Sequence, residues 1–287
     1  MATDSDSDSD LDLDLDLFSD EADQTAASIK AALLQRADQA RGQKLAALPP
    51  PSQRTPAQNR TAYVLSRQRL QPTVLPRVLT SDECELVVAA VVDYVHRQGG
   101  LQSTRHEKFP TTDVPVSDLC LRRGSPPGTA VADLVSAWVS ERVLRPLAEK
   151  TGFRPHHLGL KDLFVVCYSA PQPGPGRNSP WYPIPSQQTS LAIHSDGCLL
   201  SFTLLLNHHD AFQGGGTFFK ATARTHRVQQ GDVLIHDGGL EHAGAEVTAG
   251  QRIILVGFVE TIDVLREKLR WEAQSARRRR PIQRHPV

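Results

Sequence analysis

The sequence has few cysteines, few aromatic residues and no long apolar run. Its four cysteines lie at least 31 residues apart, so no pair has the C-x-x-C spacing of a zinc knuckle or a redox dithiol (Cys84, Cys120, Cys167 and Cys198). So few cysteines in 287 residues argue against a disulfide framework and favour a reducing compartment. No run approaches the roughly 18 apolar residues of a membrane-spanning helix, and the acidic start is unlike a secretory or transit peptide. We therefore expect a cytoplasmic or nuclear protein with no membrane partner.

The chain also lacks net charge, since 32 Lys and Arg balance 32 Asp and Glu. This balance hides two opposed ends: residues 1–23 hold ten acidic residues and no basic one, whereas residues 270–287 hold six Arg. The Ser-Asp and Leu-Asp alternation near the start would line a strand face with unpaired carboxylates, so we predict a disordered acidic tail. Composition gives no strong sign of nucleic-acid binding. It defines no oligomeric state.

Changes of composition divide the chain into regions. Residues 21–47 are rich in Ala, Leu, Gln and Lys and predict a helix, which the prolines at 49–51 end. A linker is expected from there to about Asn59. The predicted regions are an acidic tail (1–23), a helix with a Pro-rich linker (24–60), a folded domain (61–265), and a helix end with a basic tail (266–287).

Two predicted helices precede a series of short strands in the folded domain. The first helix follows a capping box of Thr80 and Glu83, runs through Val95 and ends at Gly99-Gly100; the second covers 129–150. Strands and a closing helix at about 261–275 follow (163–168, 191–194, 199–207, 216–220, 233–236 and 252–259). Short strands without intervening helices predict a mainly β (α+β) fold with flanking helices and a sandwich or jelly-roll core.

His194-Ser195-Asp196 stands at the end of a strand-like segment. In an H-x-D sequence the two side chains lie two residues apart, so both can turn inward from a strand end and offer a nitrogen and an oxygen to one ion. A third ligand must come from a neighbouring strand. The candidates are other histidines of the strand region (His208, His209, His226, His236 and His242).

Two histidines and one carboxylate on one side of an ion leave its other positions open, as in the facial triad of non-haem Fe(II) oxygenases. A structural zinc would instead need four closed ligands, usually with thiolates. Arg252 follows His242 by ten residues on an apolar segment, where an unpaired buried guanidinium costs about 3–5 kcal/mol. A dicarboxylate fits both features, because one end can chelate the ion while the far carboxylate binds Arg252 through two hydrogen bonds.

These motifs resemble those of the 2-oxoglutarate/Fe(II)-dependent oxygenases, specifically the prolyl 4-hydroxylase-like catalytic domain and most closely its lysyl hydroxylase branch. The dense part of the resemblance covers residues 161–260, and segments 79–95 and 109–116 resemble the helical region of the same domain more loosely. The motifs are His194-Ser-Asp196, Ser201-Phe-Thr-Leu-Leu-Leu-Asn207, Phe212-Gln-Gly214-Gly215-Gly216-Thr-Phe218, Gly231-Asp-Val-Leu-Ile-His236, His242, and Val247-Thr-Ala-Gly250-Gln-Arg252.

The resemblance implies a double-stranded β-helix (jelly-roll) core in which His194, Asp196 and His242 hold iron. It also implies that Arg252 binds the far carboxylate of 2-oxoglutarate and that Tyr168 contacts this co-substrate. The implied cofactors are Fe(II), 2-oxoglutarate and O2, with ascorbate as a further candidate. The implied reaction releases succinate and CO2 and hydroxylates a C–H bond. Asp196 favours hydroxylation over halogenation, because related halogenases have no carboxylate at that position.

The resemblance gives a protein prolyl or lysyl residue as the first substrate expectation, with an amino acid or other small molecule as the alternative. The segment 168–191 is expected to form a lid with Trp181 and Tyr182 as apolar contacts. Many prolyl hydroxylase-like proteins have a polar residue two positions after the arginine, whereas this chain has Ile254, which the lysyl hydroxylase branch also tolerates. Ser201 and Thr203 share one strand face, where either hydroxyl could assist the site or simply pack.

Other patterns have simpler interpretations. We expect His236 to be a solvent-facing residue at a strand end, in preference to a partner of the metal ligands. His208-His209-Asp210 is expected in a turn, and Gly214-Gly215-Gly216 in a tight turn or close strand approach. The arginines at 277–280 are expected in a solvated tail. A non-catalytic cupin-like metal-binding protein remains an alternative, whereas Phe258 counts against a nucleic-acid demethylase, which usually has a second arginine there.

Overall fold

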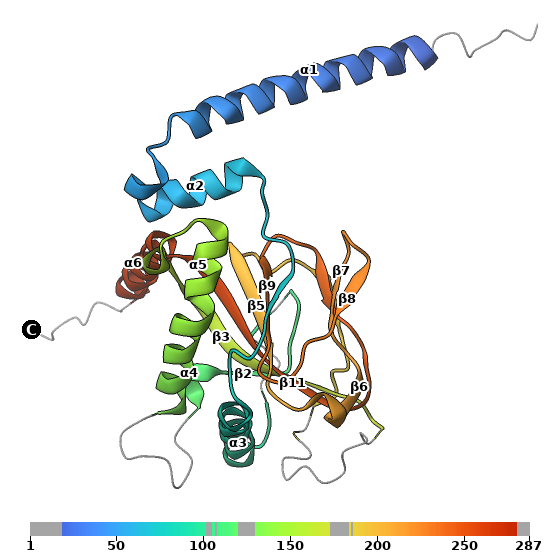
Figure 1. Ribbon diagram of the computed structural model, residues 1–287, viewed down its shortest axis with the longest axis vertical. Helices are drawn as coiled ribbons and strands as arrows, with labels where there is room; N and C mark the ends of the chain where they lie inside the picture. The colour runs from blue at the N-terminus through green and yellow to red at the C-terminus, as the bar shows by residue number, and fades with distance from the viewer. Residues whose placement is uncertain are drawn as a thin grey trace, which may run out of the picture. The chain divides into compact units, whose positions relative to one another are not determined.

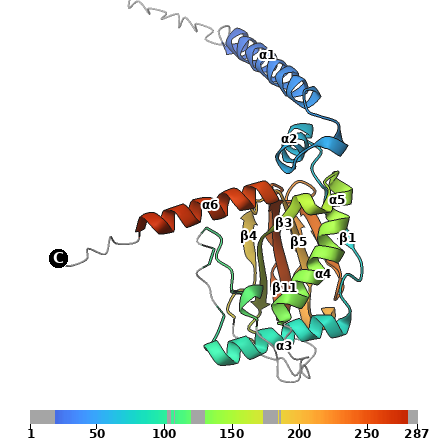
Figure 2. The ribbon, with the colours of Figure 1, turned by 90° about the vertical axis from the view of Figure 1, so that its left-hand side faces the viewer.

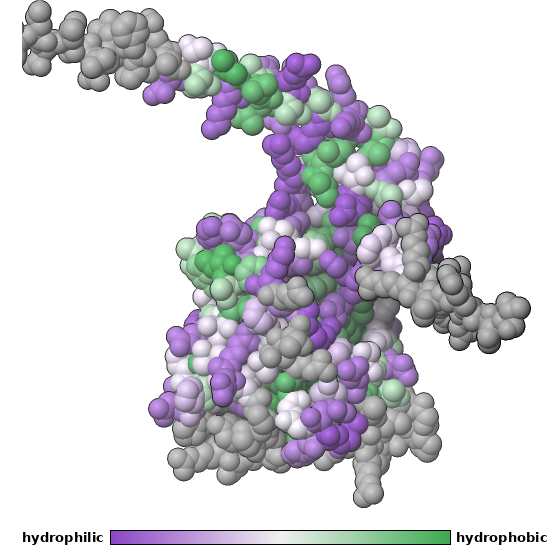
Figure 3. Space-filling model, turned by 180° about the vertical axis from the view of Figure 1, so that it is seen from behind, coloured by the Kyte–Doolittle hydropathy of each residue, from purple (hydrophilic) through white to green (hydrophobic). Residues whose placement is uncertain are grey.

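The computed structural model describes residues 19–101, 105–106, 108–119, 130–172, 184 and 186–279. The chain divides into two compact units, Met1–Leu48 and Pro49–Val287. The first contains helix α1 (Ser19–Ala46), which confirms the helix predicted over 21–47. Ile29, Leu33 and Leu34 are each more than half exposed, and apolar and hydrophilic side chains occur together along this helix (Figure 3). Intrinsic propensity therefore accounts for α1 better than burial of an apolar face does.

The second unit contains the predicted combination of helices and strands. Its helical elements are η2 (Pro51–Gln53), α2 (Pro56–Ser66), α3 (Ser81–Gln98), η3 (Val116–Asp118), α4 (Val131–Val139), η4 (Ser140–Leu144), α5 (Arg145–Thr151), η5 (Pro155–His157), η6 (His209–Ala211) and α6 (Ile262–Arg279). Its strands are β1 (Thr73–Leu75), β2 (Asp113–Pro115), β3 (Leu158–Ser169), β4 (Leu191–His194), β5 (Leu200–Leu205), β6 (Phe212–Gly214), β7 (Thr217–Phe219), β8 (Arg224–His226), β9 (Val233–Asp237), β10 (His242–Gly244) and β11 (Val247–Thr261).

Two antiparallel sheets form the core of this unit (Figure 1). The larger has the order β1-β9-β5-β11-β3-β2, with β6 paired to β11, and the smaller has the order β4-β10-β7-β8. Side chains from the two sheets meet between them: the rings of Phe219 on β7 and His236 on β9 lie 5.0 Å apart. This arrangement confirms the mainly β fold with flanking helices and its double-stranded β-helix core.

The strand β11 shows how the two faces of the larger sheet differ. Ile253 and Leu255 point to one face and join the core that α3, α4 and α5 cover, as Figure 2 shows. Ile254 and Val256 alternate with them and point between the two sheets, where Phe164 and Phe219 pack. Burial on both faces explains why this strand reads as a continuous apolar run. One face therefore stabilises the fold, and the other is available to form a site.

The two long helices follow their predicted signals with one modification. The Thr80 and Glu83 capping box and the left-handed Gly99 at the end of α3 are both present. The helix predicted over 129–150 is instead α4 and α5 joined by the π-helical turn η4. Pro146 explains the interruption, because it lacks the N–H that would continue the α-helical hydrogen bonds.

The structure differs from the predicted linker at α2, which begins at Pro56. The side chain of Thr55 accepts from Gln58 N, and Gln58 accepts from Thr55 N, so a capping box starts this helix. Two residues before the expected start of the folded domain already contact it: Asn59 bonds His157 at 3.0 Å, and Arg60 pairs with Glu260 at 2.9 Å. The prolines of this segment predicted a linker, so the capping box of Thr55 and Gln58 was not recognised as the start of a helix.

Other predicted features vary in outcome. β4 has the predicted bounds, β3 and β11 are longer than predicted, and α6 continues beyond 275 to Arg279. Gly214, Gly215 and Gly216 all have positive φ (76°, 65° and 111°), and a Cβ on Gly214 would clash with Glu246 O, so the predicted close approach of strands is present. Among the described residues, no helix is long and apolar enough to cross a membrane. The predicted acidic tail up to residue 18, Cys120, the lid residues Trp181 and Tyr182, and Arg280 onward lie outside the described residues.

Candidate active site

A cavity of about 700 Å³ opens into the space between the two sheets. Its floor consists of alternate residues of β11 (Arg252, Ile254, Val256 and Phe258) and of β3 (Phe164, Val166 and Tyr168). Antiparallel pairing places Arg252 of β11 opposite Tyr168 of β3, and Phe258 of β11 opposite Ser201 of β5. The two pairs are therefore separated along the length of β11. A cavity of this size can enclose a small molecule.

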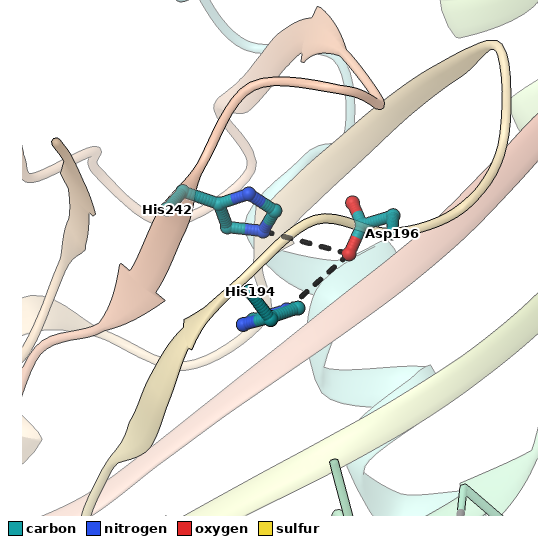
Figure 4. A group of neighbouring side chains, drawn as sticks. All are labelled: His194, Asp196 and His242. Atoms are coloured by element: carbon teal, nitrogen blue, oxygen red, sulfur yellow. Dashed lines mark ion pairs between the residues drawn. The ribbon is translucent and has the colours of Figure 1, made fainter. Parts of the chain in front are cut away.

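The structure brings His194, Asp196 and His242 together in this cavity (Figure 4). His194 ends β4, Asp196 lies in the following loop, and His242 begins β10, which pairs with β4 so that the two histidines are direct cross-strand partners. Asp196 Oδ1 lies 3.3 Å from His194 Nε2 and 3.5 Å from His242 Nε2. One ligand atom from each residue lies within 4.8 Å of the others, which is close enough for all three to bind one ion.

Both imidazole rings are oriented by the backbone. His194 Nδ1 is 2.8 Å from Ala192 O, and His242 Nδ1 is 2.9 Å from Leu240 O. A carbonyl oxygen only accepts, so each Nδ1 carries a proton and donates it. Each Nε2 is then left with its lone pair for an ion, which is the usual arrangement of metal-binding histidines. Two imidazole nitrogens and one carboxylate suit iron(II), and all three residues line the cavity.

Asp196 is held from its backbone and from its side chain. Asp196 N donates to Gly238 O at 3.0 Å, and a Cβ on Gly238 would lie only 2.4 Å from Cys198 O, so only glycine allows this close approach. Burial alone would raise the pKa of Asp196. The neighbouring His194, His242 and His236, together with the Ser201 hydroxyl, hold that pKa below its ordinary value. The carboxylate therefore stays charged and ready to bind a cation.

His236 corrects one sequence-based expectation. It is 1% exposed instead of solvent-facing, and its ring lies 4.7 Å from that of His242. Its Nδ1 donates to Asp237 O at 2.9 Å, and burial lowers its pKa to about 4, so it is neutral. The structure thus places a neutral ring against His242, while His236 Nε2 has no hydrogen-bond partner among the described residues, so a role as partner to the metal ligands stays a prediction. The isolated strand-end position in the sequence did not reveal that the second sheet covers it.

Arg252 lies in the same cavity with 3% exposure. Its guanidinium carbon is 5.8 Å from the centre of the Tyr168 ring, and no carboxylate of the described residues pairs with it. Burial lowers its pKa to about 10, so it remains a cation at neutral pH. Asn207 fixes the strand around it by donating to Gln251 O and accepting from Ile253 N, at 2.7 and 2.9 Å. The site therefore presents a rigid, uncompensated positive charge to an anion.

Tyr168, Ser201, Thr203 and Ile254 all line the cavity. Burial raises the pKa of Tyr168 to about 12, which keeps its phenol protonated and able to donate a hydrogen bond. Ser201 is close enough to Asp196 to lower its pKa, whereas Thr203 is not among the groups that shift the pKa of any of the three candidate ligands. From the sequence either hydroxyl could assist the site, whereas in the structure only Ser201 of the two affects the pKa of Asp196.

A second cluster of the same composition lies on the surface. His208, His209 and Asp210 have ligand atoms close enough to share an ion, but their side chains are 57%, 47% and 73% exposed. They surround the short η6 turn, as the sequence predicts. His226 lies on β8 and contacts Phe219 instead of the three candidate ligands. Of the histidines considered as the third ligand, the structure groups only His242 with His194 and Asp196 among the described residues.

No local pattern in the sequence pointed to the cavity wall formed by Arg105, His106, Lys108 and Phe109. The Phe109 ring lies 5.0 Å from that of His194, and His106 packs 4.7 Å from Phe164. Gln188 holds this segment by donating to Pro110 O and accepting from Thr112 N, at 3.2 and 2.8 Å. The wall therefore depends on contacts between residues far apart in the chain, which only the fold brings together.

Comparison with known proteins gives partial similarities. No family model matches the chain. A PKHD-type hydroxylase of Prochlorococcus marinus (strain SARG) is 27% identical over 111 residues, which are 36% of this chain and 49% of that protein. Another, of Prochlorococcus marinus strain MIT 9313, is 34% identical over 64 residues, or 22% of this chain and 29% of that protein. The chain thus spans half or less of the length of these curated relatives.

Solved structures with a related arrangement include a viral collagen prolyl hydroxylase of Paramecium Bursaria Chlorella virus-1, with 15% identity, a TM-score of 0.42, and coverage of 67% of this chain and 96% of that chain. A prolyl-4-hydroxylase of Pseudomonas putida has 17% identity, a TM-score of 0.42, and coverage of 67% and 92%. AviO1 of Streptomyces viridochromogenes Tue57 has 15% identity, a TM-score of 0.46, and coverage of 70% and 94%. In sequence, the chain is similar over part of its length to proteins named PKHD-type hydroxylases.

Proposed function

We propose that this protein is a 2-oxoglutarate- and Fe(II)-dependent dioxygenase that hydroxylates a C–H bond and releases succinate and CO2. The observation that carries the proposal is the combination of two groups in one cavity. His194, Asp196 and His242 form an open two-imidazole, one-carboxylate set, and Arg252 is a buried cation without a carboxylate partner among the described residues. The similarity to proteins named hydroxylases supports the same reaction class.

Each residue has a distinct role in this proposal. Both histidines hold Fe(II) through Nε2, and Asp196 holds it through a carboxylate oxygen. Ala192 O orients the His194 ring, Leu240 O orients the His242 ring, and the Ser201 hydroxyl acts on Asp196. Fe(II), when bound together with 2-oxoglutarate and O2, supplies the oxidising chemistry. Ascorbate is a further candidate cofactor.

The rest of the cavity binds and shields the co-substrate. Arg252 forms a two-pronged bond with the far carboxylate of 2-oxoglutarate, which gives its buried charge a partner. Tyr168, opposite Arg252 in the sheet, contacts the co-substrate through its phenol. Ile254, Val256 and Phe258 cover the floor with apolar surface and exclude water from the reacting groups.

We propose a protein prolyl or lysyl side chain as the substrate and residues 61–265 as the oxygenase domain, which Asn59 and Arg60 at the start of α2 contact. The aromatic lining residues Phe109, Phe164 and Phe258 suit the aliphatic part of either side chain. An amino acid or another small molecule is the alternative.

The test combines turnover with a substrate screen. The full chain is incubated with Fe(II), 2-oxoglutarate and O2, succinate is quantified, and peptide pools are examined for the mass gain of one oxygen atom. Succinate together with an oxidised peptide supports the proposal. Succinate without any oxidised peptide, but with an oxidised small molecule, supports the alternative substrate class. Metal binding without succinate would indicate a non-catalytic cupin-like protein and contradict the proposal.

A further inference from the structure

A second cavity of about 700 Å³ shares Arg105 as a lining residue with the candidate active site. It is bounded by Asp133 and Ser136 of α4, Ser117 of η3, and Asp162 and Leu163 of β3. None of these residues lines the cavity that contains His194, Asp196 and His242, whereas Arg105 lines both. One side chain is therefore shared by the walls of two adjoining cavities.

Arg105 is fixed in this position by carboxylates from two strands. Its Nη1 donates to Asp113 of β2 at 2.7 Å, and its Nη2 donates to both oxygens of Asp162 at 2.9 Å. The guanidinium also lies 5.3 Å from the centre of the Phe164 ring, and its side chain keeps 20% exposure. These bonds do not use every N–H of the guanidinium, so Arg105 can still donate to a molecule that passes from one cavity to the other.

The two cavities differ in charge. Among the described residues that line the second cavity, the carboxylates of Asp133 and Asp162 face one cation, Arg105, which Asp162 already pairs with. Asp133 is exposed, and no basic side chain of the described residues pairs with it. In the first cavity the charged lining residues are Arg105, Lys108, Arg252 and Asp196. The second cavity is therefore complementary to a cationic group, whereas the first is not.

We propose that the second cavity is a substrate subsite for a basic residue, so that the substrate is an extended polypeptide with Lys or Arg near its hydroxylated residue. This inference rests on the proposed hydroxylase function of the first cavity. A polypeptide fits because its backbone can cross Arg105, accept a hydrogen bond from it, and place one side chain in each cavity. A small metabolite would fill one cavity of this size without reaching the other.

The experiment uses Asp133, because its exposure allows substitution without loss of a buried partner. Wild type, Asp133→Asn and Asp133→Lys are compared with Glu141→Gln, a matched control that removes an exposed carboxylate farther along the same helical region. The probes are fluorescein-labelled nine-residue peptide pools with a central Pro or Lys and with Arg, Gln or Glu fixed at one flanking position. Binding to the full chain with Mn(II) and 2-oxoglutarate is measured by fluorescence anisotropy.

Arg pools are expected to bind wild type and Glu141→Gln up to about fivefold more tightly than Gln pools at one or two flanking positions, the range for an exposed ion pair. Asp133→Asn loses this preference, and Asp133→Lys reverses it in favour of Glu. Equal binding of Arg and Gln pools to wild type, an unchanged preference in Asp133→Asn, or no binding of any pool overturns the proposal. Because binding is measured without turnover, failure of the hydroxylase function appears separately, as absence of succinate.

Discussion

Among the described residues, two clusters combine two histidines with one aspartate at distances that allow a shared ion, and they differ in burial and in how their rings are held. In the cluster of His194, Asp196 and His242, the three side chains are at most 9% exposed and the backbone orients both rings. In the cluster of His208, His209 and Asp210, each side chain is at least 47% exposed and the residues are consecutive. We therefore expect the buried cluster, whose lone pairs are prearranged inside a cavity, to bind a metal ion more tightly than the exposed cluster.

Substitution of a ligand is the strongest test of this difference. His194→Ala or Asp196→Ala should abolish 2-oxoglutarate turnover, because two remaining ligands cannot hold the ion in the open geometry. His208→Ala should leave turnover unchanged. Succinate formation is the measurement, and circular dichroism checks that each variant folds. Succinate production at the wild-type rate in either of the first two variants would refute the site.

Arg252→Lys should produce the next largest effect. Lysine keeps the charge but cannot form the two-pronged bond, so the 2-oxoglutarate concentration for half-maximal turnover should rise about 10- to 100-fold. The Fe(II) requirement should change far less, because Arg252 is not a ligand. Arg266→Lys on α6 is the control for the same chemical change at the surface. An unaltered 2-oxoglutarate requirement in Arg252→Lys would contradict its role.

Ser201→Ala tests whether a residue next to a candidate ligand affects the affinity for metal. Loss of the Ser201 hydroxyl, which helps keep the pKa of Asp196 low, should weaken Mn(II) binding about tenfold, the lower end for partners of metal ligands. Ser201→Thr, which retains the hydroxyl, should bind nearly as wild type, and so should Thr203→Val, which removes the other hydroxyl of this strand face. Calorimetric titration measures all three. Equal weakening in Thr203→Val would show a general effect of the cavity wall.

The smallest effect is expected at the exposed cluster. The double variant His208→Gln and His209→Gln should change the free energy of unfolding by less than about 0.5 kcal/mol, as is usual for exposed residues. The number of tightly bound Mn(II) ions per chain should also stay the same. Denaturant unfolding and metal analysis measure these quantities. Loss of a bound ion in this variant would place a metal at the surface cluster.

Local sequence signals predicted the parts of the molecule that depend on neighbours along the chain. The bounds of β4, the Thr80 and Glu83 capping box and the Gly214-Gly215-Gly216 turn all follow from residues within a few positions of one another. The grouping of His194, Asp196 and His242 was predicted through motif resemblance, because their spacing alone left five candidates for the third ligand. Their roles with iron remain predictions.

Features that depend on long-range contacts were beyond the sequence. The burial of His236 arises from Phe219 on the opposite sheet, and the Arg105 bond to Asp162 joins residues 57 positions apart. The start of α2 differs from the sequence-based expectation for another reason. The prolines indicate a linker, but Pro56 occupies the first turn of α2, a position that proline favours. Burial and pairing across the fold therefore required the structure.

The central claim, that the buried cluster and Arg252 form one site for Fe(II) and 2-oxoglutarate, is tested most directly by anaerobic titration of the full chain with both. Chelation of Fe(II) by 2-oxoglutarate should give a weak visible charge-transfer band with one equivalent of iron. The band should persist in the His208→Gln and His209→Gln double variant and disappear in His194→Ala. A chain that gives no band, or a band that survives in His194→Ala, would contradict the claim.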